Sequence, residues 1–351
     1  MLVETLLPLG KVDPGLREPG TSLDIRRVFG DAQLVESLGY DALMVEETKE
    51  DPYMVMALAA EATQRLGLGT AVAIAFPRSP TVTAMSAWKL QELSAGRFTL
   101  GLGSQVRGHI ERRFGFRWHP PGPWMREYIQ AVRAVWDSWQ HRVPLDFDGD
   151  HYKLNLIVPL FDPGPIEHPH IPIHVAAVNE YMSEVAGEVA DGLRPHPVCT
   201  PEYIEQIMLP AIERGKRKAN RADASFSISI KPLIATAPDE ETFVRKVKDI
   251  RARVAFYAST PAYRAAFEQH GLGELADELK HLSKAQRWED MPQFIDDAIL
   301  DRYATVGMYD EIAAKLKDRY GKLVTNVEFS IPVNDENDAA TLKSMLDVLR
   351  T

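Results

Sequence analysis

The stretch "LGLGTAVAIAFPRSPTVTAMSAWKLQELSAGRFTLGLGSQ", residues 66–105, decides the fold. Its first part, 66–76, is an apolar run that predicts a strand, and its last part, 97–103, predicts another. Between them, 79–96 predicts a helix that begins with Ser-Pro and ends at a glycine, the usual residues at those two ends. Two apolar strands joined by a single helix form a βαβ unit, so the two strands are expected to run parallel.

The same alternation of strand and helix continues on both sides of this unit. Further strands are expected at 2–8, 42–47, 171–178, 193–197, 226–236 and 325–333. Further helices are expected at 23–39, 51–63, 125–139, 179–192, 200–219 and 336–350. About eight such units in one domain spanning 1–351 predict an α/β fold, a TIM (β/α)8 barrel. An open, doubly wound sheet is the alternative.

Local signals support the helices of the first half. Asp51 is placed to cap the second helix and Pro52 to occupy its first turn, while Gly39 is expected to end the first helix. The first helix is expected to bury one face, made of Ile25, Val28, Phe29, Ala32 and Val35.

Two segments depart from the alternation. The proline- and aspartate-rich stretch 142–170 predicts an insertion before the fifth strand that partly pairs as a hairpin. The stretch from 239 to about 322 reads as a long helical excursion. The insertion 142–170 and the stretch 255–300 are expected to form a lid over an apolar, partly aromatic substrate pocket. The aromatic candidates are Phe147, Tyr152, Phe161, Phe256, Tyr257 and Trp288.

The composition excludes several classes of protein. A net charge of −10 argues against nucleic acid as the main partner. The single cysteine, Cys199, excludes an intrachain disulfide and fits a reducing, cytoplasmic location. No signal peptide is read at the N-terminus, and no apolar run approaches the roughly 18 residues of a membrane span.

In a TIM barrel, chemistry takes place at the carboxyl ends of the strands. One such end carries Gly101-x-Gly103-Ser104, and its backbone amides and the Ser104 hydroxyl are candidates for holding a phosphate. Gln105 and His109 follow this strand end and are further candidate contacts for the bound group, with Arg107 between them. By itself this pattern equally fits tight packing, because the third glycine of a dinucleotide fingerprint is absent.

Two other strand ends supply candidate catalytic residues. Glu46 and Glu47 adjoin, so at most one is expected to face the barrel mouth; Glu47 is the candidate, as an acid/base or a cofactor contact. His196, between two prolines, could donate to a substrate carbonyl or shuttle a proton. A helix-capping loop carboxylate and a structural histidine are the alternatives.

No metal site is expected. His168, His170 and His174 are spaced as metal ligands can be, but two of them lie in a proline-broken loop. No carboxylate pattern accompanies them.

Several segments taken together resemble the bacterial luciferase-like flavin- and deazaflavin-dependent oxidoreductases. They are "LGYDALMVEET" (38–48), 66–115, "MREYIQAVRAVW" (125–136), "VAGEVADGLRPHP" (185–197) and "YATVGMYDEIAAKL" (303–316). The likeness is closest to an actinobacterial-type subgroup that uses the deazaflavin coenzyme F-420, through "FPRSP" (76–80), "GLGSQV" (101–106), "FDPGP" (161–165) and "FYASTPAYR" (256–264).

The resemblance implies where a coenzyme lies. A non-prolyl cis peptide behind the coenzyme ring corresponds here to Ala71-Val72. The coenzyme phosphate corresponds to two strand ends, Gly103-Ser104 and the run of Ala176, Ala177, Val178 and Asn179. The resemblance also implies a TIM barrel and a homodimer formed through the second and third helices.

The chain departs from this family at two positions. Some deazaflavin members carry Asp-His after the second strand, where this chain has Glu47 and Thr48. A sugar-phosphate branch has a glutamate where this chain has Val106. The expected activity is hydride transfer between coenzyme F-420 and a small organic substrate. The alternatives are an FMN-dependent monooxygenase that uses reduced flavin and oxygen, and a flavin-binding barrel without turnover.

Overall fold

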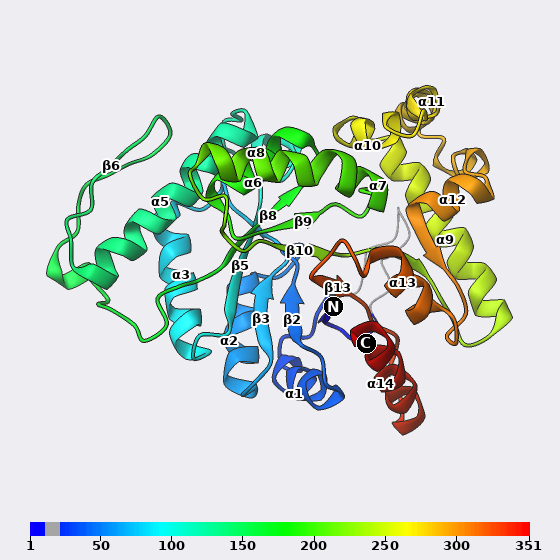
Figure 1. The fold of residues 1–351 in the computed structure, drawn as a ribbon, viewed down its shortest axis with the longest axis horizontal. Coiled ribbons are helices and arrows are strands. Elements are labelled where there is room, and N and C mark those ends of the chain that lie inside the picture. Colours follow the sequence, from blue (N-terminus) through cyan, green and yellow to red (C-terminus); the bar gives the residue numbers. More distant parts are fainter. Residues whose placement is uncertain (11–21) are drawn as a thin grey trace.

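The computed structural model describes residues 1–10 and 22–351, which form a closed parallel β-barrel surrounded by helices (Figure 1). The strands pair in the order β3-β2-β1-β13-β10-β9-β8-β5, and a pairing of β3 with β5 closes the ring. The predicted TIM barrel is therefore confirmed, and the open doubly wound sheet is wrong. The barrel strands are β1 (Leu2–Leu6), β2 (Ala42–Val45), β3 (Gly67–Thr70) with its continuation β4 (Ala73–Ile74), β5 (Phe98–Gly103), β8 (Ile173–Ala177), β9 (Gly192–Pro195), β10 (Ser227–Ile230) and β13 (Asn326–Glu328).

The helices that cover the barrel follow the expected order. They are α1 (Val28–Leu38), α2 (Pro52–Ala62), α3 (Pro80–Leu93), α5 (Pro121–His141), α6 (Glu180–Val189), α8 (Leu209–Lys218), α13 (Ile312–Tyr320) and α14 (Glu336–Arg350). Short helical segments are α4 (Arg107–Arg112), α7 (Pro201–Tyr203), a π-helical turn at Ile204–Met208, and 3-10 turns at Pro159–Phe161, Pro261–Tyr263, Trp288–Asp290 and Pro292–Phe294.

The caps lie where the sequence places them, but one predicted face is partly wrong. The Asp51 side chain accepts hydrogen bonds from the amides of Tyr53 and Met54, and Gly39 ends α1 in the left-handed region at φ 91°. In α1 the buried residues are Val28, Ala32, Val35 and Leu38, whereas Ile25 and Phe29 are exposed. The helix begins only at Val28, so Ile25 precedes it and Phe29 lies on its outer side.

The insertion contains the expected hairpin, with β6 (Phe147–Asp148) antiparallel to β7 (Lys153–Leu154). Its turn is held by one carboxylate: Glu127 on α5 accepts hydrogen bonds from the amides of Asp150, His151 and Tyr152. The hairpin projects away from the barrel beyond α5 (Figure 1).

The sequence predicted a helical stretch from 239 to about 322, but the segment also contains a strand. It contains α9 (Glu240–Ala258), α10 (Arg264–Glu268), α11 (Gly273–Lys284) and α12 (Asp297–Tyr303). A short strand, β12 (Ala304–Val306), then pairs in parallel with β11 (Leu233–Ala235) outside the barrel. Three residues directly after a helix are too few to show the alternation of a strand. Over the described residues, no helix is long and apolar enough to cross a bilayer.

Candidate functional site

A cavity of about 800 Å³ opens at the carboxyl ends of the barrel strands. It brings together most of the predicted site residues: Glu47, Ala71, Val72, Gly103, Ser104, Gln105, Ala176, Ala177, Val178, Asn179 and His196. His109 is not among the lining residues; its side chain is exposed on α4, although Arg107 and Gly108 of the same helix do line the cavity. The prediction that His109 contacts the coenzyme therefore receives no support from the geometry.

None of the six aromatic lid candidates lines this cavity, although residues 260–263 of the predicted lid stretch 255–300 do. Phe161 is exposed, and the insertion 142–170 contributes no residue among those described. The aromatic side chains in the wall are Trp118 and Tyr263, and Thr260, Pro261 and Ala262 precede Tyr263. The excursion after β11 thus covers the mouth through residues 260–263 alone.

One wall of the cavity is formed by small residues at the break between β3 and β4. The Ala71-Val72 peptide is cis, as the resemblance implied. The Ala71 amide donates to the Val45 carbonyl at 2.7 Å, which ties this break to the end of β2. Opposite, a Cβ added to Gly103 would lie 2.5 Å from Val72 Cγ2. The Val72 side chain therefore packs directly over Gly103, and neither residue places a bulky side chain into the cavity.

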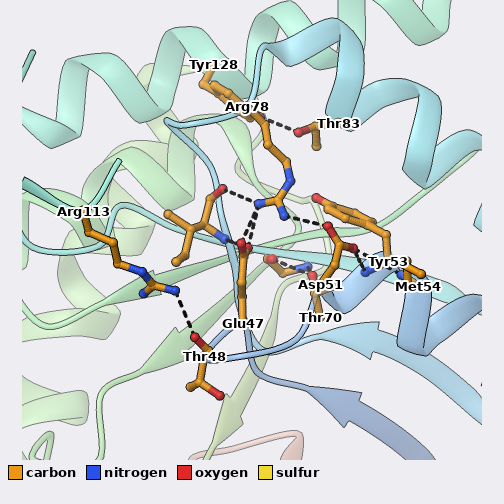
Figure 2. A network of polar contacts seen from close by, with 12 residues as sticks. Glu47, Thr48, Asp51, Tyr53, Met54, Thr70, Arg78, Thr83, Arg113 and Tyr128 are labelled. Carbon is orange, nitrogen blue, oxygen red and sulfur yellow. Dashed lines mark hydrogen bonds and ion pairs between the residues drawn. The ribbon is translucent and has the colours of Figure 1, made fainter. Parts of the chain in front are cut away.

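Glu47 lies in the wall and is held in place by Arg78 (Figure 2). Its carboxylate accepts hydrogen bonds from Arg78 Nη1 at 2.7 and 2.8 Å and from the Ile74 amide at 2.7 Å. The second guanidinium nitrogen, Nη2, donates to Asp51 at 3.0 Å. Burial alone would lower the pKa of Arg78, but the hydrogen bonds and charge of Glu47 raise it. The arrangement fixes Glu47 as an acceptor and favours a positioning role over a proton donor.

Sequence reasoning missed the partner of Arg78. The "FPRSP" segment that carries it was noted only as part of a resemblance, and no sequence spacing links residue 78 to residue 47. A second arginine holds the residue after Glu47 in place: Arg113 Nη2 donates to the Thr48 carbonyl at 3.0 Å (Figure 2).

The expectation that only one of Glu46 and Glu47 faces the mouth is wrong, because both line the cavity. The strand β2 ends at Val45, so the alternation of a strand no longer applies to the two glutamates. Glu46 accepts a hydrogen bond from Lys231 Nζ at 2.6 Å, and Lys231 lies 3.6 Å from Glu328.

His196 is neutral in the folded protein. Burial first, and the charge of Lys231 second, lower the pKa of His196 to about 3. Its Nδ1 accepts a hydrogen bond from the Val198 amide at 3.3 Å, which assigns the proton to Nε2. The ring stacks on Tyr263 with centroids 4.1 Å apart. Of the two predicted roles, the geometry favours a hydrogen-bond donor over a proton shuttle.

Residues 104–106, in the turn after β5, form hydrogen bonds with one another. The Ser104 hydroxyl donates to the Gln105 carbonyl at 3.2 Å, and Gln105 Oε1 accepts from the Val106 amide at 2.7 Å. Across the cavity, the Asn179 side chain caps α6 by accepting from the Met182 amide at 2.9 Å. The amino end of α6 therefore faces the cavity, which suits a negatively charged group.

His174 lies apart from the loop that carries His168 and His170. It is buried on β8, and its Nδ1 has no hydrogen-bond partner among the described residues. Burial and the charge of Arg194 lower its pKa to about 3. Over residues 1–10 and 22–351, no group of three or more His, Cys, Asp or Glu side chains is arranged to hold a metal ion.

The buried His174 predicts a pH-dependent stability. A histidine with a depressed pKa stabilises the fold above the pKa of the unfolded chain, about 6.5, and this contribution is lost as pH falls below it. Between pH 7.5 and 5, wild type is expected to lose about 2 kcal/mol more unfolding free energy than His174→Leu. Urea unfolding at both pH values measures this difference. Replacing the exposed His281 with leucine is the control; if His281→Leu changes the slope equally, the explanation fails.

Comparison with known proteins identifies the family. A family described as luciferase-like monooxygenase matches residues 9–326, so this chain belongs to that family. An uncharacterised protein of Mycobacterium tuberculosis, Rv1360, is 41% identical over 303 residues, covering 86% of this chain and 89% of that one. Another protein of the same organism, Rv3520c, provisionally named a coenzyme F-420-dependent oxidoreductase, is 28% identical over 303 residues and covers 80% of this chain and 84% of that one.

A solved structure agrees with the fold. The coenzyme F-420-dependent tetrahydromethanopterin reductase of Methanopyrus kandleri superimposes with a TM-score of 0.72 at 20% identity. The match covers 98% of this chain and 96% of that one. At this identity the likeness establishes the barrel, while its chemistry belongs to that enzyme.

Proposed function

We propose that this chain is an oxidoreductase that transfers a hydride between coenzyme F-420 and a small organic substrate. The observation that supports it most is the open wall of small residues at Ala71, Val72 and Gly103 within the mouth of the barrel. The relationship to Rv3520c supports the choice of coenzyme. The single cysteine is consistent with a cytoplasmic enzyme.

The residues present fit such a coenzyme. The flat ring would lie against Ala71 and Val72, where an added side chain at Gly103 would collide with Val72. The phosphate of the tail would lie between the turn at Ser104-Gln105 and the amino end of α6 at Asn179. When bound, the coenzyme supplies a ring carbon that gives or accepts a hydride.

The other residues of the cavity orient the substrate. The His196 Nε2–H is placed to donate to a carbonyl or alcohol oxygen, and its ring is held by the stack with Tyr263. The pair of Glu47 and Arg78 fixes the wall between β2 and β4. Residues 260–263 and Trp118 restrict the access of water.

A titration tests the choice of coenzyme. Purified protein is titrated with F-420 and with FMN, each oxidised and reduced, while absorbance and fluorescence are followed. Selective binding of F-420 supports the proposal. Selective binding of reduced FMN, with oxygen consumed during turnover, supports the alternative of a monooxygenase, which the family description keeps open. Coenzyme binding without turnover of any alcohol or ketone in a broad panel supports a non-catalytic barrel.

A variant pair makes the titration specific to this cavity. Gly103→Val is expected to abolish binding of either coenzyme, because its Cβ would meet Val72 Cγ2 at 2.5 Å. Gly30→Ala on α1 is the control, since an added Cβ there has no neighbour within 4 Å. Unchanged binding by Gly103→Val means that the ring lies elsewhere.

His196 is expected to act on the rate more than on coenzyme binding. His196→Ala should lower kcat by about 10²-fold, the typical loss when one oriented donor to developing charge is removed. The dissociation constant for F-420 should stay within about twofold. Because the pKa of His196 is about 3, kcat of the wild type should show no titration of this group above about pH 5. If kcat of the wild type shows a titration step that His196→Ala removes, His196 acts as a proton shuttle instead.

We further propose that the protein forms a homodimer through α2 and α3, which lie side by side (Figure 1). Both helices expose large apolar side chains: Met54, Leu58, Val82, Met85 and Leu93. Exposed apolar patches of this kind mark protein interfaces. Met54→Glu with Met85→Glu is expected to convert a dimer into a monomer in sedimentation velocity. The matched control is Leu160→Glu with Phe161→Glu on the insertion, which should leave the dimer intact.

A further inference from the structure

A second cavity lies beside the first, at the carboxyl ends of β10, β13 and β1. Its volume is about 150 Å³, enough for a small polar group. It is bordered by α9, which packs against β11. The residues important here are Thr5, Lys231, Thr236, Lys246, Arg253 and Tyr309. The ends of the seventh and eighth strands of a TIM barrel frequently hold a phosphate, and β10 and β13 are those strands.

The cationic residues outnumber the anionic ones in this cavity. Lys246 and Arg253 lie two turns apart on α9, and Lys231 comes from the end of β10. The carboxylates are Asp249, which is exposed, and Glu328. Burial first raises the pKa of Glu328 to about 7, with Lys231 acting in the opposite direction. Lys231 is already compensated by Glu46 and Glu328, so the charge that matters for a bound anion is that of Lys246 on α9.

Lys246 is the cationic residue of this cavity that a bound anion would stabilise most. It is half-buried, and within the described part of the chain no carboxylate lies within 4.0 Å of its amine. Burial lowers the pKa of Lys246, with the charge of Asp249 on the same helix acting in the opposite direction. A partly desolvated ammonium without an ion pair is unfavourable. A bound anion would compensate the ammonium group of Lys246 for the hydration that it loses on burial.

Hydroxyl groups complete the lining. The Thr236 hydroxyl is buried and has no hydrogen-bond partner among the described residues. Thr5 and Tyr309 add two further hydroxyls to the lining. Cations combined with hydroxyl donors are the groups that bind carboxylates and phosphates in proteins.

The two cavities share a wall. Lys231 lines the second cavity and donates to Glu46, which lines the first. His196 faces the first cavity and the next residue, Pro197, lines the second. A ligand with its anionic end in the second cavity would reach His196 only by passing the contact between Lys231 and Glu46.

We propose that the second cavity binds the carboxylate or phosphate group of the substrate, with Lys246 as its principal ion-pairing residue. The substrate is then an organic anion whose reacting carbon lies near His196. This inference rests on the proposed function, because it assigns the substrate class of that same site.

Isothermal titration calorimetry tests the site with two probes, inorganic phosphate and succinate, at constant ionic strength. Wild type is expected to bind at least one probe saturably, and Lys246→Gln is expected to bind it at least about tenfold more weakly. The two probes distinguish a phosphate from a carboxylate ligand. Lys248→Gln is the control, since Lys248 is exposed on the same helix. Absence of saturable binding, or equal binding by Lys246→Gln, overturns the proposal.

A second measurement separates this inference from the choice of coenzyme. The kcat/KM for 3-hydroxybutyrate is compared with that for neutral 2-butanol. Wild type should favour the anion by at least about tenfold, and Lys246→Gln should remove the preference through KM, with the Kd for F-420 unchanged. Equal kcat/KM values in wild type overturn the substrate class and leave the coenzyme assignment standing. Failure of F-420 to bind, with phosphate or succinate binding intact, overturns the coenzyme assignment alone.

Discussion

Replacing Gly101 with alanine is expected to cost about 3 kcal/mol or more of unfolding free energy, and to abolish coenzyme binding in whatever protein still folds. A Cβ at this position would lie 1.8 Å from the Thr70 carbonyl oxygen, which belongs to the backbone. The two strands cannot separate locally, because Thr70 Oγ1 donates to the Gly101 carbonyl at 2.6 Å and accepts from the Gly101 amide at 2.9 Å. The clash must therefore displace the end of β3.

The effect should be specific to this close approach. Urea unfolding of Gly101→Ala is compared with that of Gly30→Ala, where an added Cβ has no neighbour within 4 Å. Gly30 lies inside α1, so alanine there is expected to be neutral or to stabilise by up to about 1 kcal/mol. If the two variants have the same stability, β3 and β5 lie farther apart at Thr70 and Gly101 than the structure shows.

The barrel could be predicted because its signals are local. Asp51 before Pro52 and Ser79 before Pro80 are caps that act within three residues, and both form as expected. Apolar runs at regular intervals then predict parallel strands without any knowledge of their partners. The strand β12 escaped prediction because three residues carry no periodicity.

The site could be predicted only in part, for a related reason. The strand ends that line the cavity follow from the topology of a barrel. The partners of the charged residues do not, because Glu47 with Arg78, and Glu46 with Lys231, are joined across 31 and 185 positions of the sequence. His109 was predicted from its nearness in sequence to Ser104, but a helical turn carries its side chain outward.

Replacing Arg194 with methionine is expected to cost about 3–5 kcal/mol of unfolding free energy, the typical loss when one partner of a buried ion pair is removed. The Arg194 guanidinium bonds to the Glu4 carboxylate, and the two side chains are 8% and 0% exposed. Methionine keeps most of the volume and leaves Glu4 without its partner inside the barrel. Urea unfolding at pH 8 measures the loss.

Two controls distinguish lost charge compensation from lost packing. Adding Glu4→Gln to Arg194→Met removes the stranded carboxylate, so the double variant should regain at least half of the loss. Arg27→Met, whose partner Asp31 lies 3.6 Å away at the surface, should cost less than about 1 kcal/mol. A double variant no more stable than Arg194→Met would show instead that Arg194 acts through its packing.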